Sequence, residues 1–189
     1  MVISTWFDAY RHHFLTTLGT PSFDRVYDGE QIDYPFAMMV YRARNGLVFC
    51  TCGLSMYSGR IGEVLEICCP LLGTELLDAE RILVAMILDV LHTPGQIHPG
   101  MAIDGIDAEF PEFYSKHAKS SIYISDLQPD YEMLDLDVIH NGGTGRVYQE
   151  TFITSEESRF LIDHGQDAFE DLLAEKNVVS DDLDRPSAL

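Results

Sequence analysis

The chain has 189 residues, 46% of them hydrophobic and 11% aromatic, which suits one globular domain with its own core. It carries 31 acidic residues against 12 lysines and arginines, a formal net charge of −19. Such a surface repels nucleic acid and anionic lipid and favours encounters with a basic protein, although the same composition also suits solubility or a salt-adapted host.

The sequence shows no sign of export or of a membrane span. No apolar run reaches the roughly 18 residues that a transmembrane helix needs. The first residues lack the basic region and long apolar stretch of a secretory signal. Four cysteines, two of them adjacent, are poor material for a disulfide framework. We therefore expect a cytoplasmic protein that binds neither nucleic acid nor membrane.

The first third of the chain predicts one helix followed by antiparallel strands. Apolar residues at three- to four-residue spacing predict a helix over residues 4–18, capped by Ser4 or Thr5 and ended by Gly19. The turn Arg44-Asn45-Gly46 favours a hairpin, and Pro70 is expected to stop the last strand. The expected strands are residues 22–27, at an edge, 36–42, 47–52 and 63–69.

The remainder predicts a second apolar helix, more strands and a helical end. Thr74 begins a helix with a wide apolar stripe, which Pro94-Gly95 stops. Ser155 opens a terminal helical region that Gly165 divides. Further strands are expected at residues 101–103, 121–125, 133–140 and 146–153.

The order of these elements predicts an α+β domain. A mostly antiparallel sheet would carry the helices on one side. We expect residues 1–178 to form this single domain. Residues 179–189 are polar and acidic with little to bury, so we expect them to form a disordered tail.

The cysteines are expected to be small core residues. Cys50 and Cys52 lie two apart on a strand and share a face, whereas the adjacent Cys68 and Cys69 point to opposite faces. Zinc sites usually take a ligand pair from a C-x₂-C turn, and neither pair has that spacing. A zinc site or a disulfide between the strands remains an alternative reading.

No motif predicts catalysis, a metal or a cofactor. The seven histidines form no H-x-x-x-H or H-E-x-x-H pair, and no serine occupies a G-x-S-x-G turn. The glycine-rich residues 142–145 lack the lysine and following helix of a phosphate-binding loop. We expect a protein that is not an enzyme. A metal protein or enzyme using cysteine and histidine, or a regulatory subunit, is the alternative.

Acidic residues gather in two clusters, at residues 104–112 and 126–137. The second cluster lacks the glycine and terminal glutamate of a calcium-binding EF-hand loop. Both clusters fit a solvated acidic loop, and both fit a docking surface for a basic partner. In the second case the partner-binding residues would be Asp104, Asp107, Glu109, Glu112, Asp126 and Asp130.

Three segments occur in an order that is typical of one family. Residues 50–55, Cys-Thr-Cys-Gly-Leu-Ser, form a strand that ends in a Gly-Leu-Ser turn. Residues 63–67, Glu-Val-Leu-Glu-Ile, lead into an apolar helix and a turn at 95–100. Residues 152–157 lead from a strand into a helix that begins Ser-Glu-Glu, and residues 164–169 follow with His-Gly. Across residues 30–176 the chain resembles the Suppressor of fused family, and in particular its stand-alone bacterial members.

The resemblance implies an α+β binding module without known catalytic activity. The animal protein uses this domain, together with a second one absent here, to hold an extended peptide by strand addition. An acidic side chain in the turn after the central helix contributes there, and Met101 stands at that place in this chain, so the site is not carried over. Many bacterial members resemble immunity proteins that neutralise toxins by binding them. The partner expected here is a basic protein, with a toxin as one case.

Overall fold

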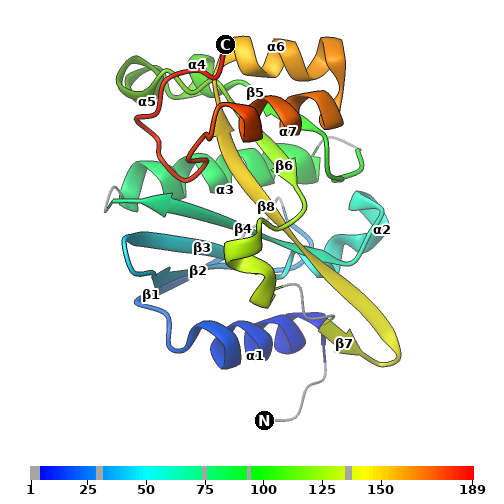
Figure 1. Ribbon diagram of the computed structural model, residues 1–189. Helices are drawn as coiled ribbons and strands as arrows, with labels where there is room; N and C mark the ends of the chain where they lie inside the picture. Colours follow the sequence, from blue (N-terminus) through cyan, green and yellow to red (C-terminus); the bar gives the residue numbers. More distant parts are fainter. Residues whose placement is uncertain (1–4, 29–31, 74–75, 93–94, 135–137) are drawn as a thin grey trace.

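The centre of the molecule is a sheet with the strand order β1-β2-β3-β4-β8-β6-β5, and β7 pairs with β8 (Figure 1). The computed structural model describes residues 5–28, 32–73, 76–92, 95–134 and 138–189. β4 and β8 pair in parallel and the other pairs are antiparallel, so the predicted mostly antiparallel α+β fold is confirmed. The strands are β1 (Phe23–Tyr27), β2 (Phe36–Arg42), β3 (Gly46–Cys52), β4 (Leu65–Leu72), β5 (Ala102–Asp104), β6 (Ser121–Ser125), β7 (Val138–His140) and β8 (Gly143–Ile153).

Helices connect and cover these strands. The α-helices are α1 (Trp6–Leu18), α2 (Ser58–Ile61), α3 (Leu76–His92), α4 (Ile106–Glu109), α5 (Pro111–His117), α6 (Ser155–His164) and α7 (Gln166–Glu175). Two 3₁₀ helices, η1 (Leu54–Tyr57) and η2 (Pro129–Leu134), complete the set. Part of the segment expected as a strand over 133–140 is therefore helical, and residues 135–137 lie outside the described residues.

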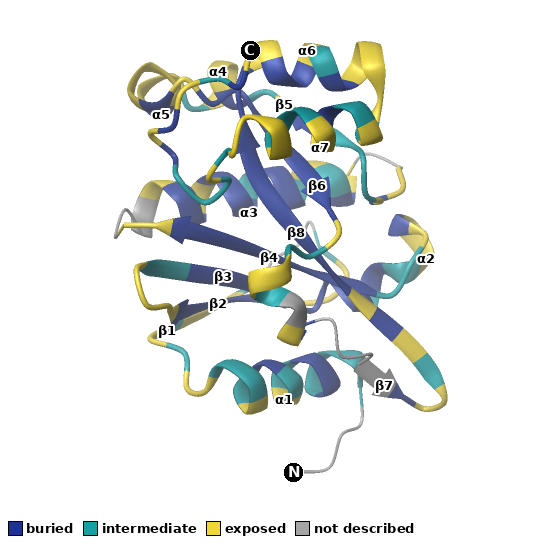
Figure 2. Cartoon of the chain, in the orientation of Figure 1, coloured by how far each residue is buried: buried dark blue, intermediate teal, exposed yellow. Residues whose placement is uncertain are grey.

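The helices cover both faces of the sheet, which corrects the expectation of one covered side. α1 packs through Tyr10 and Phe14 on one face, in a cluster that includes Met39 of β2. α3 packs on the other face, in a cluster that includes Met38 and Val40 of the same strand. Figure 2 shows β2 buried along most of its length between these helices. The unbroken apolar run of β2 is typical of a strand that is covered on both sides.

All four cysteines are buried and free, so the prediction that they are core residues is confirmed. Cys50, Cys52 and Cys68 lie in the cluster beneath α1, and Cys69 lies in the cluster beneath α3. The adjacent pair therefore points to opposite faces, as the strand period predicted. Burial raises the pKa of each thiol above its ordinary value, which keeps these side chains protonated and apolar.

The Gly-Leu-Ser turn and a buried glutamate form one hydrogen-bonded unit. The carboxylate of Glu66 accepts five hydrogen bonds of 2.6–3.1 Å at the start of η1. Gly53 has a φ of +124°, and a Cβ there would lie 2.8 Å from the Cα of Phe36. The turn therefore needs glycine to reach the carboxylate. The donors are Thr51 Oγ1, the backbone N–H groups of Gly53, Leu54 and Ser55, and Ser55 Oγ.

β4 passes through Pro70 and continues to Leu72, which corrects the strand end expected at the proline. β4 pairs with β8 only as far as Cys68, whereas β3 accompanies it to its end. Pro70 therefore lies where the strand has one neighbouring strand, which is where a sheet tolerates a residue without an N–H. β4 and β8 diverge beyond this point.

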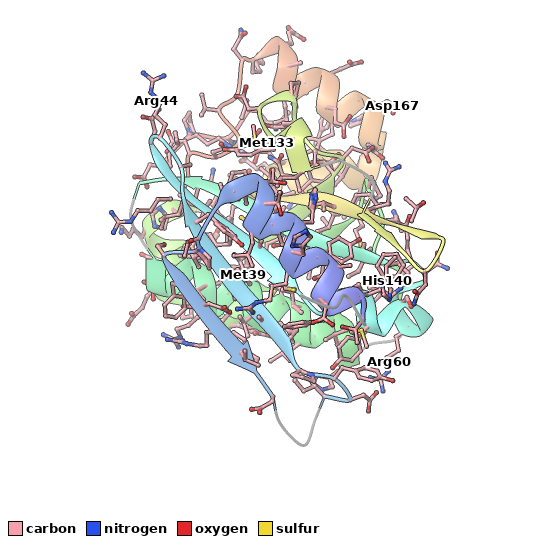
Figure 3. The ribbon with its side chains drawn as sticks, turned by 90° about the horizontal axis from the view of Figure 1, so that it is seen from below. Met39, Arg44, Arg60, Met133, His140 and Asp167 are labelled. Carbon is pink, nitrogen blue, oxygen red and sulfur yellow. The ribbon has the colours of Figure 1, made fainter. Side chains whose placement is uncertain are left out.

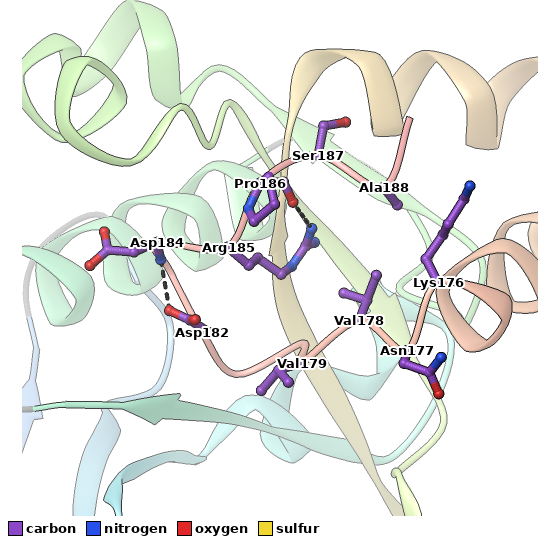
Figure 4. Close-up of a pocket in the computed structure, with 10 residues that line it drawn as sticks. All are labelled: Lys176, Asn177, Val178, Val179, Asp182, Asp184, Arg185, Pro186, Ser187 and Ala188. Carbon is purple, nitrogen blue, oxygen red and sulfur yellow. Dashed lines mark hydrogen bonds between the residues drawn. The ribbon is translucent and has the colours of Figure 1, made fainter.

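The C-terminal segment, residues 179–189, lies against both β4 and β8 (Figure 4). The backbone N–H of Leu72 donates to the oxygen of Asp181 at 2.8 Å, and Leu183 is buried in the core beneath α3. The Arg185 side chain donates to the Phe152 oxygen of β8. These contacts differ from the disordered tail that the polar composition predicted.

A buried ion pair holds this segment. Arg185 donates from Nη1 and Nη2 to the two carboxylate oxygens of Glu157, at 2.6 and 3.1 Å. The two side chains are 5% and 0% exposed. Burial opposes the charge on Glu157, but the hydrogen bonds from Arg185 and from the backbone of Thr154 and Ala188 outweigh it and lower its pKa. Lys119, also buried, donates to the Arg185 oxygen at 2.9 Å.

Candidate partner-binding surface

Among the described strands, β5 is the last at one edge of the sheet. It pairs with β6, and no other strand among the described residues pairs with it. Ala102 is half-buried, Ile103 is buried and Asp104 is exposed, so the strand lies at the surface with its apolar side chain turned inward. A free sheet edge presents unpaired N–H and C=O groups that an extended peptide can use.

Asp104 is fixed at the end of this edge by serine hydroxyls. Its Oδ1 atom accepts hydrogen bonds from Ser121 Oγ of β6, at 2.5 Å, and from Ser158 Oγ of α6, at 2.9 Å. Ser155 Oγ donates to Ser120 Oγ alongside, at 3.0 Å. These bonds connect β5, β6 and α6, so the carboxylate has a defined position at the rim. Asp104 also lines a hollow of about 280 Å³ whose other acid is Asp107.

The segment after β5 contains the other acids of the first cluster. It folds as the short helices α4 and α5, where the sequence suggested a solvated loop. Asp107 and Glu109 are exposed on α4 and Glu112 is exposed on α5. The apolar residues Ile106 and Phe113 of the same helices are buried in the core beneath α3. Spaced apolar residues between the acids were the available clue to these helices.

The second acidic cluster lies at the opposite end of β6. Asp104 pairs with Ser121, the first residue of β6, whereas Asp126 directly follows Ser125, the last residue. Asp126 is 3.8 Å from Arg146 in an exposed ion pair, and Asp130 is exposed on η2. The six acids expected to bind a partner therefore form two groups, and the edge of β5 lies beside the first.

The side chains around β5 have the chemistry of a binding surface. Exposed carboxylates beside an open edge attract lysine or arginine side chains of a peptide that pairs with the strand. The serines that hold Asp104 had no recognisable motif, because residues 120–121, 155 and 158 meet only through the tertiary structure.

Within the described part of the chain, no group of three or more histidine, cysteine, aspartate or glutamate side chains could hold a metal ion. Of the helices in that part, none is long and apolar enough to cross a membrane.

Comparisons with known proteins identify the fold. No protein-family model and no curated protein matches the chain. A solved structure described as a SUFU (suppressor of fused protein) homolog from Neisseria gonorrhoeae superposes with a TM-score of 0.72 at 16% sequence identity, covering 97% of each chain. A chain of the Sufu–Fu complex superposes with a TM-score of 0.64 at 14% identity, covering 96% of this chain and 90% of that one. The chain therefore has the Suppressor of fused fold, as the sequence motifs predicted.

Proposed function

We propose that the protein is a non-catalytic binding module that captures a basic segment of a partner protein along the open edge of β5. The observation that carries the proposal is the free edge of β5 with fixed Asp104 at its rim and exposed Asp107 and Glu109 beside it. The similar fold of a chain in the Sufu–Fu complex supports binding to a protein. The net charge of −19 supports a basic partner.

In this mechanism, charge acts before the strand contact forms. The acidic surface raises the association rate of a basic partner, most strongly at low salt. Backbone hydrogen bonds to β5 then hold the peptide, and the carboxylates beside the strand select lysine or arginine at neighbouring positions. A secreted toxin that the protein neutralises, as an immunity protein does, is the specific partner class that we propose.

The test uses the purified full chain and a short peptide of alternating lysine and valine as the probe. We expect amide shifts in a nitrogen-15 spectrum at residues 101–105, and about tenfold weaker binding by the double variant D107N/E109Q. The variant D126N/D130N is the matched control, because it removes the same charge from the opposite end of β6. Binding that both variants weaken equally, or shifts away from β5, would contradict this location.

The immunity role has a separate test. The product of the neighbouring gene is co-expressed with the chain, and the complex is measured by size-exclusion chromatography. We expect a stable complex and loss of that product's toxicity in cells. Growth arrest despite the presence of the chain would remove the immunity role while leaving the β5 peptide test unaffected.

A further inference from the structure

A hollow of about 580 Å³ lies at the end of the sheet where the β2–β3 turn meets the start of β1 and the end of β4. Phe23 and Leu47, both half-buried, line it together with the exposed residues Arg42 and Arg44. Arg42 is directly opposite Leu47 in the β2–β3 register, so the two side chains lie side by side on one face. Figure 3 shows Arg44 at the tip of the hairpin, pointing away from the body of the molecule.

Backbone hydrogen bonds hold the walls of this hollow. Ala43 N–H donates to the Gly46 oxygen at 3.0 Å and closes the turn, and Gly73 N–H donates to the Asn45 oxygen at 3.1 Å. A Cβ at Gly46 would lie only 1.9 Å from the Leu71 oxygen, so glycine permits the close approach of β4. The backbone on both sides is therefore positioned before any ligand arrives, which lowers the cost of binding.

Two exposed arginines lie together at this hollow. Among the described residues, neither guanidinium forms an ion pair or a hydrogen bond, although the sequence holds 31 acids against 12 lysines and arginines. Arg11, Arg60 and Arg146 have carboxylate partners, whereas Arg81 and Arg159, like the two arginines of the hollow, have none among the described residues. An acidic protein thus presents a local basic site beside an apolar wall.

We propose that this hollow binds an acidic segment of a protein partner, with an apolar side chain against Phe23 and Leu47 and carboxylates on Arg42 and Arg44. The planar guanidinium matches a carboxylate with two parallel hydrogen bonds. The Arg25 guanidinium lies over the Phe23 ring, 4.8 Å from its centroid, and pairs with Glu80 at 3.5 Å, so it covers one face of the ring and its charge is already paired. A nucleic acid fits less well than a peptide, because its continuous run of phosphates meets the net charge of −19, whereas a peptide needs only two carboxylates on the arginines and can place an apolar side chain on the wall beside them.

This site is separate from the proposed peptide edge. The hollow adjoins β1, and β1 and β5 are the first and last strands in the order of the sheet. The two surfaces have opposite charge and are formed by different strands. The protein can therefore hold a basic segment and an acidic segment at the same time, and failure at one site leaves the other testable.

The probe for this proposal is a short acetylated peptide of alternating aspartate and leucine, added to the nitrogen-15-labelled full chain. We expect amide shifts at Phe23 and at residues 42–47. The double variant R42Q/R44Q should bind about tenfold more weakly, since two exposed charge pairs together contribute about 1.4 kcal/mol. The affinity of R42K/R44K should lie between those of the wild type and R42Q/R44Q, because lysine keeps the charge and loses the forked geometry.

Two controls decide the outcome. R81Q/K176Q removes the same charge from exposed positions away from the hollow and should leave the affinity within about twofold. A peptide of alternating asparagine and leucine should bind about tenfold more weakly than the aspartate peptide. Equal binding of both peptides, undiminished binding by a folded R42Q/R44Q protein, or tighter binding of an oligothymidylate at the same amides would each overturn the proposal.

Discussion

Glu66 of β4 and Glu150 of β8 are buried glutamates on neighbouring strands, yet their surroundings are opposite. Glu66 is 0% exposed and accepts five hydrogen bonds. Glu150 is 3% exposed, and its Oε1 atom has no hydrogen-bond partner among the described residues. Burial raises the pKa of both carboxyl groups, and that of Glu150 reaches about 8. The hydrogen bonds that Glu66 accepts oppose the rise in the pKa of Glu66.

The difference comes from what each strand has beside it. The donors to Glu66 come from residues 51–55, and the antiparallel pairing of β3 with β4 brings these residues beside Glu66. Glu150 lies where β8 has left β4 and the C-terminal segment lies against both strands. Asp181 of that segment has a buried oxygen without a described partner as well. Around Glu66, residues 51–55 donate five hydrogen bonds to the carboxylate, which fixes the local fold. Around Glu150 the strands have separated, and buried oxygens of Glu150 and Asp181 have no partner among the described residues.

The largest effect is expected from Glu66→Ala. The change orphans three buried backbone N–H groups and leaves a cavity, so we expect a loss of about 5 kcal/mol in the free energy of unfolding. Urea denaturation followed by circular dichroism measures it. Glu175→Ala, at an exposed position, should change stability by less than about 0.5 kcal/mol. A loss at Glu66 of under about 2 kcal/mol would show that the turn does not depend on this carboxylate.

Arg185→Ala should have the next largest effect, because it leaves the Glu157 carboxylate buried with two backbone hydrogen bonds and without its arginine. We expect a loss of about 3 to 4 kcal/mol. Residues 179–189 should also become accessible to protease, since Arg185 anchors them to β8 and α6. Arg159→Ala, on the exposed side of α6, is the matched control. Protection of the segment in the Arg185 variant would mean that its apolar contacts suffice.

Glu150→Gln should alter the pH dependence of stability. The pKa of Glu150 rises from an ordinary 4.5 to about 8 on folding, so the folded state binds the proton more tightly. The protonated Glu150 stabilises the folded state fully below pH 4.5. Between pH 4.5 and about 8 this contribution to the free energy of unfolding falls by about 1.4 kcal/mol per pH unit, and above about pH 8 it is lost. Between about pH 5 and pH 8, wild type should lose about 3 kcal/mol relative to the variant. Parallel pH profiles would contradict a protonated Glu150.

The sequence predicted much of the local structure for reasons that lie close together in the chain. The helix over Trp6–Leu18 follows from its apolar period and from the Thr5 cap, whose hydroxyl accepts from the Asp8 N–H. β2 and β6 have the predicted bounds. The strand order and the parallel pairing of β4 with β8 were not predicted, because that pairing joins segments about eighty residues apart.

Of the proposed binding surface, the sequence indicated the acids and their two clusters, but not where the clusters lie on the sheet. Asp104 and Asp126 are both exposed acids, yet they lie at opposite ends of β6. The sequence did not show this, because Asp104 reaches the start of β6 only through the pairing of β5 with β6. The basic hollow had no motif, because Phe23, Arg42 and Leu47 come from three different strands.

The sequence by itself determined the α+β class, the buried cysteines and the likeness to the Suppressor of fused fold, since periodicity and turn chemistry act over a few residues. The tertiary structure decided which faces of the sheet are covered and which edges are open. It also decided that the acidic C-terminal segment packs against β4 and β8. Composition predicted a disordered tail because its charges are costly to bury alone, and the Glu157–Arg185 pair offsets that cost with a partner from a distant part of the chain.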